Sequence, residues 1–483
     1  MSTVPTPMRR PRGPGGQPLT TAERVARGKG ARVNAPRSSH GRWVPATNRP
    51  DPVALLEEQG ENRVQELVPV RHGRMLLSPF TFFRGAALIM AADLALTPRA
   101  GITVQLCGDA HLSNFGVFAS PERKMMFDIN DFDETLPGPW EWDVKRLAAS
   151  FEICGRELGF SRSDRRDVVI AAVREYRTVI RRAAKMRALE VWYDHIDVAE
   201  ILELIEDAVR KKRLGKAEAR EAQEDIAKAR TRDHLRAFTK RVGEIDGDLR
   251  FAADPPLIVP VHDLVPAGTG RGELDTWTHS LVSSYRRSLA REHHPLEEYR
   301  LVDTARKVVG VGSVGTHAWI HLFVGRDGSD PLILQSKEAQ PSVLERFLKK
   351  SAYSNCGQRV VVGQHLMQAA TDIFLGWWRA TGLDGRQHDY YTRQLHDWKG
   401  SVEPETFRVP GATVYAELCG VTLARAHARW GDRIAIATYL GKGDAFDRAI
   451  ADFAVAYADQ NERDYDAFAE AVKTGRIEAE TGL

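Results

Sequence analysis

The sequence predicts an α+β fold in which two β-rich stretches are set into a mostly helical chain. One stretch, 102–134, alternates short apolar runs with polar loops and a tight turn, which is typical of strands joined by hairpins. The other, 305–339, has the same character and carries a glycine-rich loop between apolar runs. Apolar residues recur at helical spacing over 162–240 and 411–472. We therefore expect two lobes, a helical one around the first stretch and a smaller β-rich one around the second.

The composition is that of a soluble globular chain. Of its 483 residues, 43% are hydrophobic and 28% are charged, which provides enough apolar material for a sizeable core. The most apolar span, 75–96, is interrupted by Arg84 and Asp93, so neither a membrane span nor a membrane partner is expected. The N-terminus lacks the apolar stretch of a secretory signal, and the four cysteines are scattered without a C-x-x-C pair. These features predict a cytoplasmic protein with reduced thiols.

Charge is distributed unevenly along the chain, although the net charge is only +3. Residues 1–50 hold ten Lys and Arg against one Glu, whereas the remainder holds 58 basic and 64 acidic residues. We interpret 1–50 as a basic, Pro/Gly-rich arm that is mobile or wraps the surface. The acidic body argues against nucleic acid as a partner. The run 210–238 mixes charges of both signs, so we interpret it as a solvated helix face.

The large helical lobe is predicted to span 51–300. It begins with helices at 51–68 and 78–96, the second of which starts at a Ser-Pro pair. After the first β-rich stretch, a turn opens into a helix carrying Asp143, which would cap this helix or brace the preceding loops. A helical insert, 160–300, completes the lobe.

The small β-rich lobe is predicted to span 301–400, and a helical part at 401–483 would pack on the large lobe. Pro341 and Ser342 mark the start of a helix over 341–353. The remaining predictions for this half are strands at 372–378 and 389–395, an amphipathic helix at 411–431, and an ambiguous segment, helix or strand, at 358–370.

The loops of the first β-rich stretch carry a set of side chains suited to metal and proton chemistry. Asp109 follows a strand directly, Asn114 comes five residues later, and Asp131 and Asp133 end the hairpin. Because one hairpin holds both loops side by side, Asp109, Asn114 and Asp131 should converge. Mg²⁺ favours a few hard oxygen ligands, which Asn114 and Asp131 would supply, with Asp133 assisting at a second metal. Asp109 would accept a proton from a hydroxyl, and His111 would hold the loop or touch substrate.

The loop of the second β-rich stretch contains Gly310, Gly312, Ser313 and Gly315 in a G-x-G-x-x-G pattern. A dinucleotide fingerprint requires a helix directly after these glycines, but the following THAWIHLFV has no helical period. A glycine loop at the tip of a β-hairpin instead lets backbone N–H groups approach phosphate oxygens. Lys337 ends the next strand, where it would contact the phosphates.

Two further assignments remain open from the sequence. Either Glu345, at helical spacing after the lysine strand, or Glu338 would pair with Lys337. Three arginines that precede the first β-rich stretch would either point toward a phosphate or serve the structure: Arg71, Arg74 and Arg84.

The two sets of motifs resemble those of protein kinases. The pattern D-x-x-x-x-N followed by D-F is how kinases arrange their catalytic and metal loops, and G-D-x-H-x-x-N with D-F-D is similar to the aminoglycoside and choline kinase branch. The order is reversed, however, because the glycine loop and lysine strand follow the catalytic loops instead of preceding them. The resemblance therefore implies a protein-kinase-like two-lobe fold that is circularly permuted.

Longer motifs resemble a second family, the bacterial domain of unknown function 2252. They are RHGRMLLSPFTFFRGAA, CGDAHLSNFGVFASPER, FDINDFDETLPGPWEWDVKRLAAS, DPPLIVP and YYTRQLHDWKGS. The similarity runs from about residue 20 to the C-terminal helix. This resemblance implies no substrate of its own.

Together these patterns predict an ATP- and Mg²⁺-dependent phosphotransferase that acts on a hydroxyl group of a small molecule or a protein. Two alternatives use the same site: a nucleotidyl transferase, and a nucleotide-binding module that regulates partners without turnover. A metal hydrolase based on His111, Asp109 and Asp128 is disfavoured because no second histidine lies nearby in the sequence.

Overall fold

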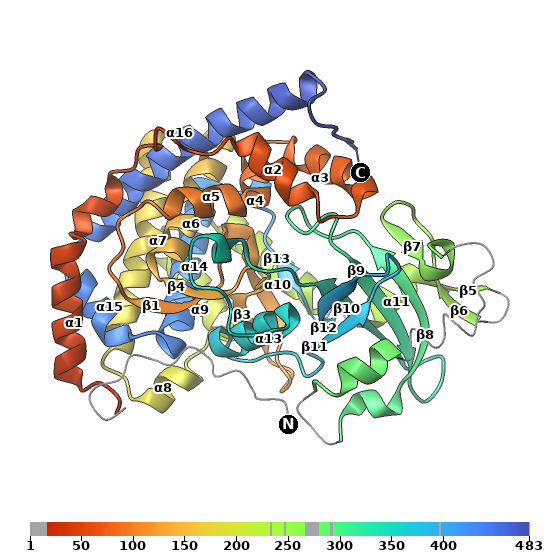
Figure 1. Ribbon diagram of the computed structural model, residues 1–483. Helices are drawn as coiled ribbons and strands as arrows, with labels where there is room; N and C mark the ends of the chain where they lie inside the picture. The colour runs from red at the N-terminus through yellow and green to blue at the C-terminus, as the bar shows by residue number, and fades with distance from the viewer. Residues whose placement is uncertain are drawn as a thin grey trace.

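The computed structural model describes residues 17–231, 234–245, 248–265, 280–289, 293–395 and 398–482. It confirms the mixed α+β class: helices gather on one side of the molecule, and a six-stranded sheet lies on the other (Figure 1).

Long helices form the core of the helical side. The longest are α6 (Glu141–Glu157), α7 (Arg162–Ala183), α14 (Val409–Trp430) and α16 (Ala445–Lys473). Helices α7 and α14 approach so closely that a Cβ on Gly420 would lie 2.1 Å from the carbonyl oxygen of Ala172. The buried Trp140, just before α6, stacks on Tyr176 with ring centroids 5.7 Å apart. Helix α7 is thus part of the main core, although it falls in the segment predicted as an insert.

Shorter helices surround this core. They are α1 (Thr21–Asn34), α2 (Pro52–Gly60), α3 (Val68–Met75), α4 (Pro79–Gly85), α5 (Ala87–Leu94), α8 (Ala188–Tyr193), α9 (Val198–Arg210), α10 (Lys216–Arg230), α11 (His234–Arg241), α13 (Cys356–Met367) and α15 (Arg433–Leu440). Within the basic N-terminal segment, α1 packs on α15, where Arg32 donates to the carbonyl oxygen of Tyr439 at 2.8 Å. Arg49 pairs with the buried Asp93 and Asp464. The described part of this segment therefore wraps the body; residues 1–16 lie outside the described residues.

The large sheet is antiparallel, with strand order β11-β12-β10-β9-β8-β7. Its strands are β7 (Ile258–Pro260), β8 (Arg300–Lys307), β9 (Ala318–Val324), β10 (Pro331–Glu338), β11 (Gly376–Thr381) and β12 (Gln387–Gln394). Every residue of β9 is buried because separate apolar clusters cover the two faces, one around Trp319 and Phe323 and the other around Ile320 and Leu322. The glycine-rich loop connects β8 to β9, so the predicted hairpin is present.

Smaller sheets hold the polar loops. Strand β1 (Thr103–Leu106) pairs with β4 (Leu136–Pro139), and β2 (Phe115–Ala119) pairs with β3 (Met125–Ile129) and with β13 (Gly400–Ser401). A separate hairpin consists of β5 (Val242–Ile245) and β6 (Asp248–Phe251). The segment predicted as a turn before α6 is strand β4. Its pairing with β1 draws the loop after β1 and the loop after β3 together.

The helix predicted over 341–353 is wrong. Only a 3-10 turn forms there, at Val343–Arg346, and the next helix is α13, in the segment that the sequence left ambiguous. Tertiary hydrogen bonds to Glu134 replace helical ones. The Ser342 hydroxyl donates to the carbonyl oxygen of Glu134 at 2.9 Å, and the Val343 N–H donates to the Glu134 carboxylate at 2.7 Å. Asn355 instead caps α13 by accepting from the Gln358 N–H.

Candidate functional site

The loops after β1 and β3 line one cleft together with the glycine-rich loop. From the first two loops come Asp109, His111, Asn114, Asp131 and Asp133. From the glycine-rich loop come Gly310, Gly312 and Ser313, which follow in the sequence about 180 residues later. We call this space the small cleft; its volume is about 140 Å³.

The Asp143 side chain fixes the loop that carries Asp109. The Asp143 carboxylate accepts hydrogen bonds from the backbone N–H groups of Cys107 at 2.8 Å and Gly108 at 3.0 Å. Gly108 has φ +86°, and a Cβ there would lie 2.2 Å from the carbonyl oxygen of Glu134. Of the two roles predicted for Asp143, bracing the loop is therefore the one observed.

The Asp109 carboxylate is oriented by Arg146. The Arg146 Nε lies 2.7 Å from Asp109 Oδ1, and the guanidinium packs 3.9 Å from the centroid of the Phe83 ring. The Asp109 side chain stays 20% exposed, so its second oxygen can meet a substrate. His111 lies 3.8 Å from that oxygen, and burial lowers the pKa of its ring well below the ordinary value. His111 is therefore neutral and contributes little charge.

Asn114 and Asp131 present oxygen atoms to the same space. The Asn114 side-chain NH₂ donates to the carbonyl oxygen of Asp109 at 2.7 Å, which leaves its amide oxygen for another partner. Asp131 is 32% exposed; its Oδ1 accepts from the Asp133 N–H at 3.2 Å, and its Oδ2 lies 3.5 Å from Lys337 Nζ. These two side chains have the ligand types that Mg²⁺ prefers.

Lys337 joins the sheet to the acidic loops. Its Nζ lies 2.6 Å from Asp133 Oδ2, and the hydroxyl of Tyr391, opposite Lys337 in the sheet, donates to Asp133 Oδ1 at 2.6 Å. Burial alone would lower the pKa of Lys337, but Asp131 and Asp133 raise it above the ordinary value. Burial alone would likewise raise the pKa of Asp133, and Lys337 and Tyr391 lower it. The pair is thus fully ionised at neutral pH.

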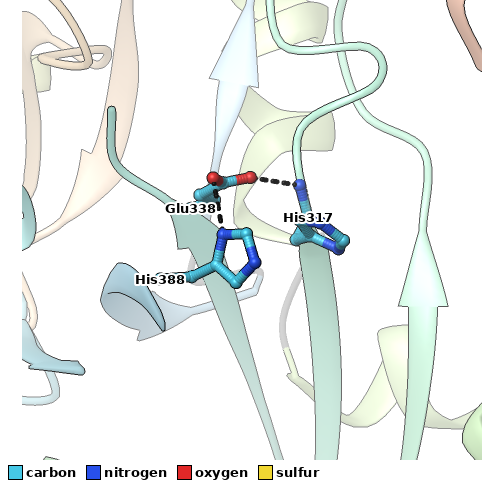
Figure 2. Close-up of side chains that lie close together, drawn as sticks. All are labelled: His317, Glu338 and His388. Atoms are coloured by element: carbon cyan, nitrogen blue, oxygen red, sulfur yellow. Dashed lines mark hydrogen bonds and ion pairs between the residues drawn. The ribbon is translucent and has the colours of Figure 1, made fainter. Parts of the chain in front are cut away.

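Neither glutamate predicted for Lys337 contacts it among the described ion pairs, where its partners are Asp131 and Asp133. Glu345 lies on the 3-10 turn described above. Glu338 turns toward the histidines shown in Figure 2. Its carboxylate accepts from the backbone N–H of His317 at 2.9 Å and lies 3.0 Å from the ring nitrogen Nδ1 of His388. Side chains alternate along a strand, so Glu338 and its neighbour Lys337 point to opposite faces of the sheet.

His317, Glu338 and His388 have the ligand types of a metal site, and their ligand atoms lie within 4.8 Å of one another. However, His388 Nε2 also lies 3.0 Å from Asp384. Burial would lower the pKa of His388, but hydrogen bonds with Asp384 and Glu338 raise it. Both ring nitrogens of His388 therefore already face carboxylates, which favour its charged form without a metal ion.

Of the three arginines that precede the first β-rich stretch, Arg74 contacts the glycine-rich loop. Gly310 and Gly315 have φ of +67° and +86°, a conformation that favours glycine. Arg74 donates to the carbonyl oxygen of Gly310 at 2.6 Å, and the Ser313 hydroxyl donates to Asp133 at 3.2 Å. Arg71 is fully buried and bonds to Gln59 and to the Gly85 carbonyl, so its role is structural. Arg84 lines the small cleft.

Comparison with known families identifies the chain. Residues 63–471 match the family described as "Uncharacterized protein conserved in bacteria (DUF2252)". The chain belongs to this family. No curated protein and no solved structure matches it. Among the described residues, no helix has the length and apolar character needed to span a bilayer.

A second space within the region matched to DUF2252, which we call the basic cleft, adjoins the small cleft. Asp131, Gly310 and Ser313 line both, and the basic cleft is larger, at about 610 Å³. Cations from four parts of the chain line it in addition to Lys337: Arg236, Lys240 and Arg241 on α11, Lys307 on β8, Arg393 on β12, and Lys399 after β12.

These cations act on one another. Arg393, and secondly burial, lowers the pKa of Lys399 to about 7. Burial, followed by Arg241, lowers the pKa of Lys307 to about 8. Sequence reasoning missed this cleft, since the run 210–238 was interpreted as a solvated face and the end of that run contributes to it. The strand pattern could have indicated Arg393. It lies two residues after Tyr391, so both side chains are on the same face of the sheet as Gln335 and Lys337.

Proposed function

We propose that the protein is an ATP- and Mg²⁺-dependent phosphotransferase with a circularly permuted, protein-kinase-like arrangement. The order of elements supports this. A glycine loop between β8 and β9, a lysine strand β10, helix α13, two strands and the helix α14 follow one another as in a kinase small lobe and its linker. The catalytic loops precede them in the sequence, after β1 and β3.

One observation carries the proposal. Lys337 Nζ reaches the acidic loop, 2.6 Å from Asp133 and 3.5 Å from Asp131, although about 200 residues of sequence separate them. Ser313 of the glycine-rich loop bonds to the same Asp133 carboxylate. A lysine, a glycine loop and acidic side chains at one point form the set that holds a triphosphate and its metal in kinases.

Each residue then has a role in phosphoryl transfer. Asp109, oriented by Arg146, accepts the proton of the attacking hydroxyl in the small cleft. Gly310, Gly312, Ser313 and Gly315 cover the phosphates, and Lys337 contacts them. Asp133 anchors Lys337, because both of its oxygens already accept hydrogen bonds.

Asn114 and Asp131 would hold Mg²⁺. The residues fit this cation, because among the described hydrogen bonds the Asn114 amide nitrogen is engaged while its oxygen is not, and because Asp131 lines both clefts. When bound, the metal neutralises charge on the phosphates. A small cleft of about 140 Å³ accommodates the reacting hydroxyl group, while the rest of the acceptor extends beyond it.

Isotope transfer tests the proposal. Purified protein is incubated with Mg²⁺ and ATP labelled at the γ- or α-phosphate, together with an extract of hydroxyl-bearing metabolites and proteins. We expect γ-label in a product, and none with Asp109→Asn. Transfer of α-label would instead favour a nucleotidyl transferase. Absence of any transfer, with binding of Mg²⁺-ATP intact, would favour a regulatory module.

Metal binding is tested separately by thermal shift. Mg²⁺-ATP should stabilise the wild-type protein more than ATP with EDTA does, and Asp131→Asn should lose this difference. Asp225→Asn, at an exposed position on α10, is the matched control and should keep it. Equal shifts for wild type and Asp131→Asn would contradict the metal assignment.

A further inference from the structure

Among the described residues, the basic cleft contains far more positive than negative charge. Asp131 is the one carboxylate among its described lining residues. Among the described ion pairs, none includes Lys240, Arg241, Lys307 or Lys399, which line the cleft. Bringing several cations together in a partly buried space costs free energy, so such an arrangement is explained best by an anionic ligand.

The walls of the cleft are unsuited to a nucleobase. A base binds between apolar or aromatic faces, with polar groups placed at its edges. Among the described lining residues, the large apolar side chains are Val309 and Leu395, and none is aromatic. The sheet contributes Gln335 and Lys337 from β10, with Arg393 directly opposite Gln335. This wall consists of hydrogen-bond donors for oxygen atoms.

The position of the cleft fits a chain of phosphates. It ends at Gly310, Ser313 and Asp131, which also line the small cleft that contains Asp109. A ligand that fills the basic cleft therefore has its terminal group beside the metal ligands and the glycine loop. The cations of α11 and Lys399 would then surround the other phosphates.

We propose that the basic cleft is an oligophosphate-binding site, an inference that rests on the proposed function. The site recognises the phosphoryl donor through its phosphate groups and not through its base. It therefore binds inorganic tripolyphosphate as tightly as it binds a nucleoside triphosphate. The ligand class is thus a linear chain of three or more phosphates, with or without a nucleoside attached. Charge-assisted hydrogen bonds from Lys and Arg supply the affinity.

Calorimetric titration of the full chain tests the inference, with tripolyphosphate, ATP, GTP and adenosine as probes in Mg²⁺ buffer. We expect dissociation constants for tripolyphosphate, ATP and GTP within about threefold of one another, and no binding of adenosine. Affinity should fall steeply as salt increases, since the contacts are ionic. Binding of adenosine, or ATP binding more than about tenfold tighter than tripolyphosphate and GTP, would overturn the inference.

Variants locate the binding. Lys399→Met and Lys307→Met should each weaken tripolyphosphate and ATP by about tenfold and by the same factor. Lys228→Met, at an exposed lysine of α10, should change neither. Loss of ATP binding alone in the two cleft variants would contradict phosphate recognition.

Experiments can distinguish a failure of the oligophosphate-binding proposal from a failure of the proposed phosphotransferase function. Asp109→Asn should bind tripolyphosphate as the wild type does, because Asp109 does not line the basic cleft. Tripolyphosphate binding without any transfer from ATP would remove the proposed function and keep the inference. Transfer from ATP that tripolyphosphate cannot inhibit would remove the inference and keep the function.

Discussion

The small cleft and the basic cleft meet at Asp131, Gly310 and Ser313, yet they balance charge in opposite ways. In the small cleft, three carboxylates are each held in place by a basic side chain: Asp109 by Arg146, Asp133 by Lys337, and Glu338 by His388. In the basic cleft, cations face other cations, and the pKa values of Lys307 and Lys399 fall.

The difference separates positioning from binding. Paired charges fix the direction of a side chain before substrate arrives, which is what proton transfer and metal binding require. Unbalanced charges do not fix geometry, but they release free energy when a ligand of opposite charge enters. The small cleft is therefore the part suited to chemistry, and the basic cleft is the part suited to affinity.

The largest expected effect comes from Asp109→Asn. Asparagine has nearly the same shape and keeps a hydrogen bond with Arg146, but it cannot accept the hydroxyl proton. Phosphoryl transfer should fall by at least about 100-fold, with little change in binding of ATP. Steady-state rates measure the transfer, and calorimetric titration measures the binding. Unchanged turnover would show that the small cleft does not supply the base.

Lys337→Met should have the next largest effect, because Lys337 lies where the two clefts meet. The change leaves Asp133 ionised beside Tyr391 and Ser313 without its cation, at an expected cost of about 3 kcal/mol in the free energy of unfolding. ATP affinity should also fall. Urea denaturation measures the stability of this variant.

The double variant Lys337→Met/Asp133→Asn sharpens this test. Removing the unpaired charge should recover part of the lost stability, because the two positions are in direct contact at 2.6 Å. If the two single changes add without any recovery, the ion pair does not hold the clefts together.

The two regions also differ in how far the sequence predicted them. The set Asp109, Asn114, Asp131 and the glycine-rich loop followed from local rules, since polar residues directly after strands and glycines at a hairpin tip mark loops that meet at a sheet edge. The structure brings these residues into one cleft. Phosphoryl transfer itself remains a prediction.

Contacts between side chains that lie far apart in the sequence were harder to predict. Arg146 is three residues after Asp143 on α6, on the same helix face, and this spacing could have linked it to the Asp109 loop. The pairing of Lys337 with Asp133 instead of Glu345 depends on tertiary contacts that stop the helix expected at 341–353. The basic cleft combines α11, β8 and β12, which no local pattern connects.

Lys399→Met should sharpen the contrast by stabilising the ligand-free protein. Arg393 first, then burial, lowers the pKa of Lys399 to about 7, while Asp131, Lys337 and Asp133 also act on it. The unfolded chain, with a lysine pKa of about 10.4, binds more protons between pH 7 and 10. Wild-type stability from this group therefore rises with pH over that window. The free energy of unfolding of the variant should be higher than that of the wild type by on the order of 1 kcal/mol at pH 7. The variant should also lose the rise in stability with pH.

Denaturation between pH 6.5 and 9.5 measures the effect of Lys399→Met, with Lys228→Met as the control. A loss of stability at pH 7 would mean that Lys399 is held by a favourable partner, and the contrast between the clefts would weaken.

The smallest expected effect concerns the rim of the small cleft, where His388 contacts Glu338 (Figure 2). Burial opposes the charge, but Asp384 and Glu338 raise the pKa of His388 above its unfolded value near 6.5. Its stabilising contribution is therefore fully present below pH 6.5 and is lost as pH rises through the folded pKa. His388→Gln should cost about 1 kcal/mol at pH 5.5 and less at pH 8.5, as measured by denaturation at the two pH values. A cost for His388→Gln that grows toward pH 8.5 would show that this ring is neutral, and the small cleft would then carry an unmatched carboxylate.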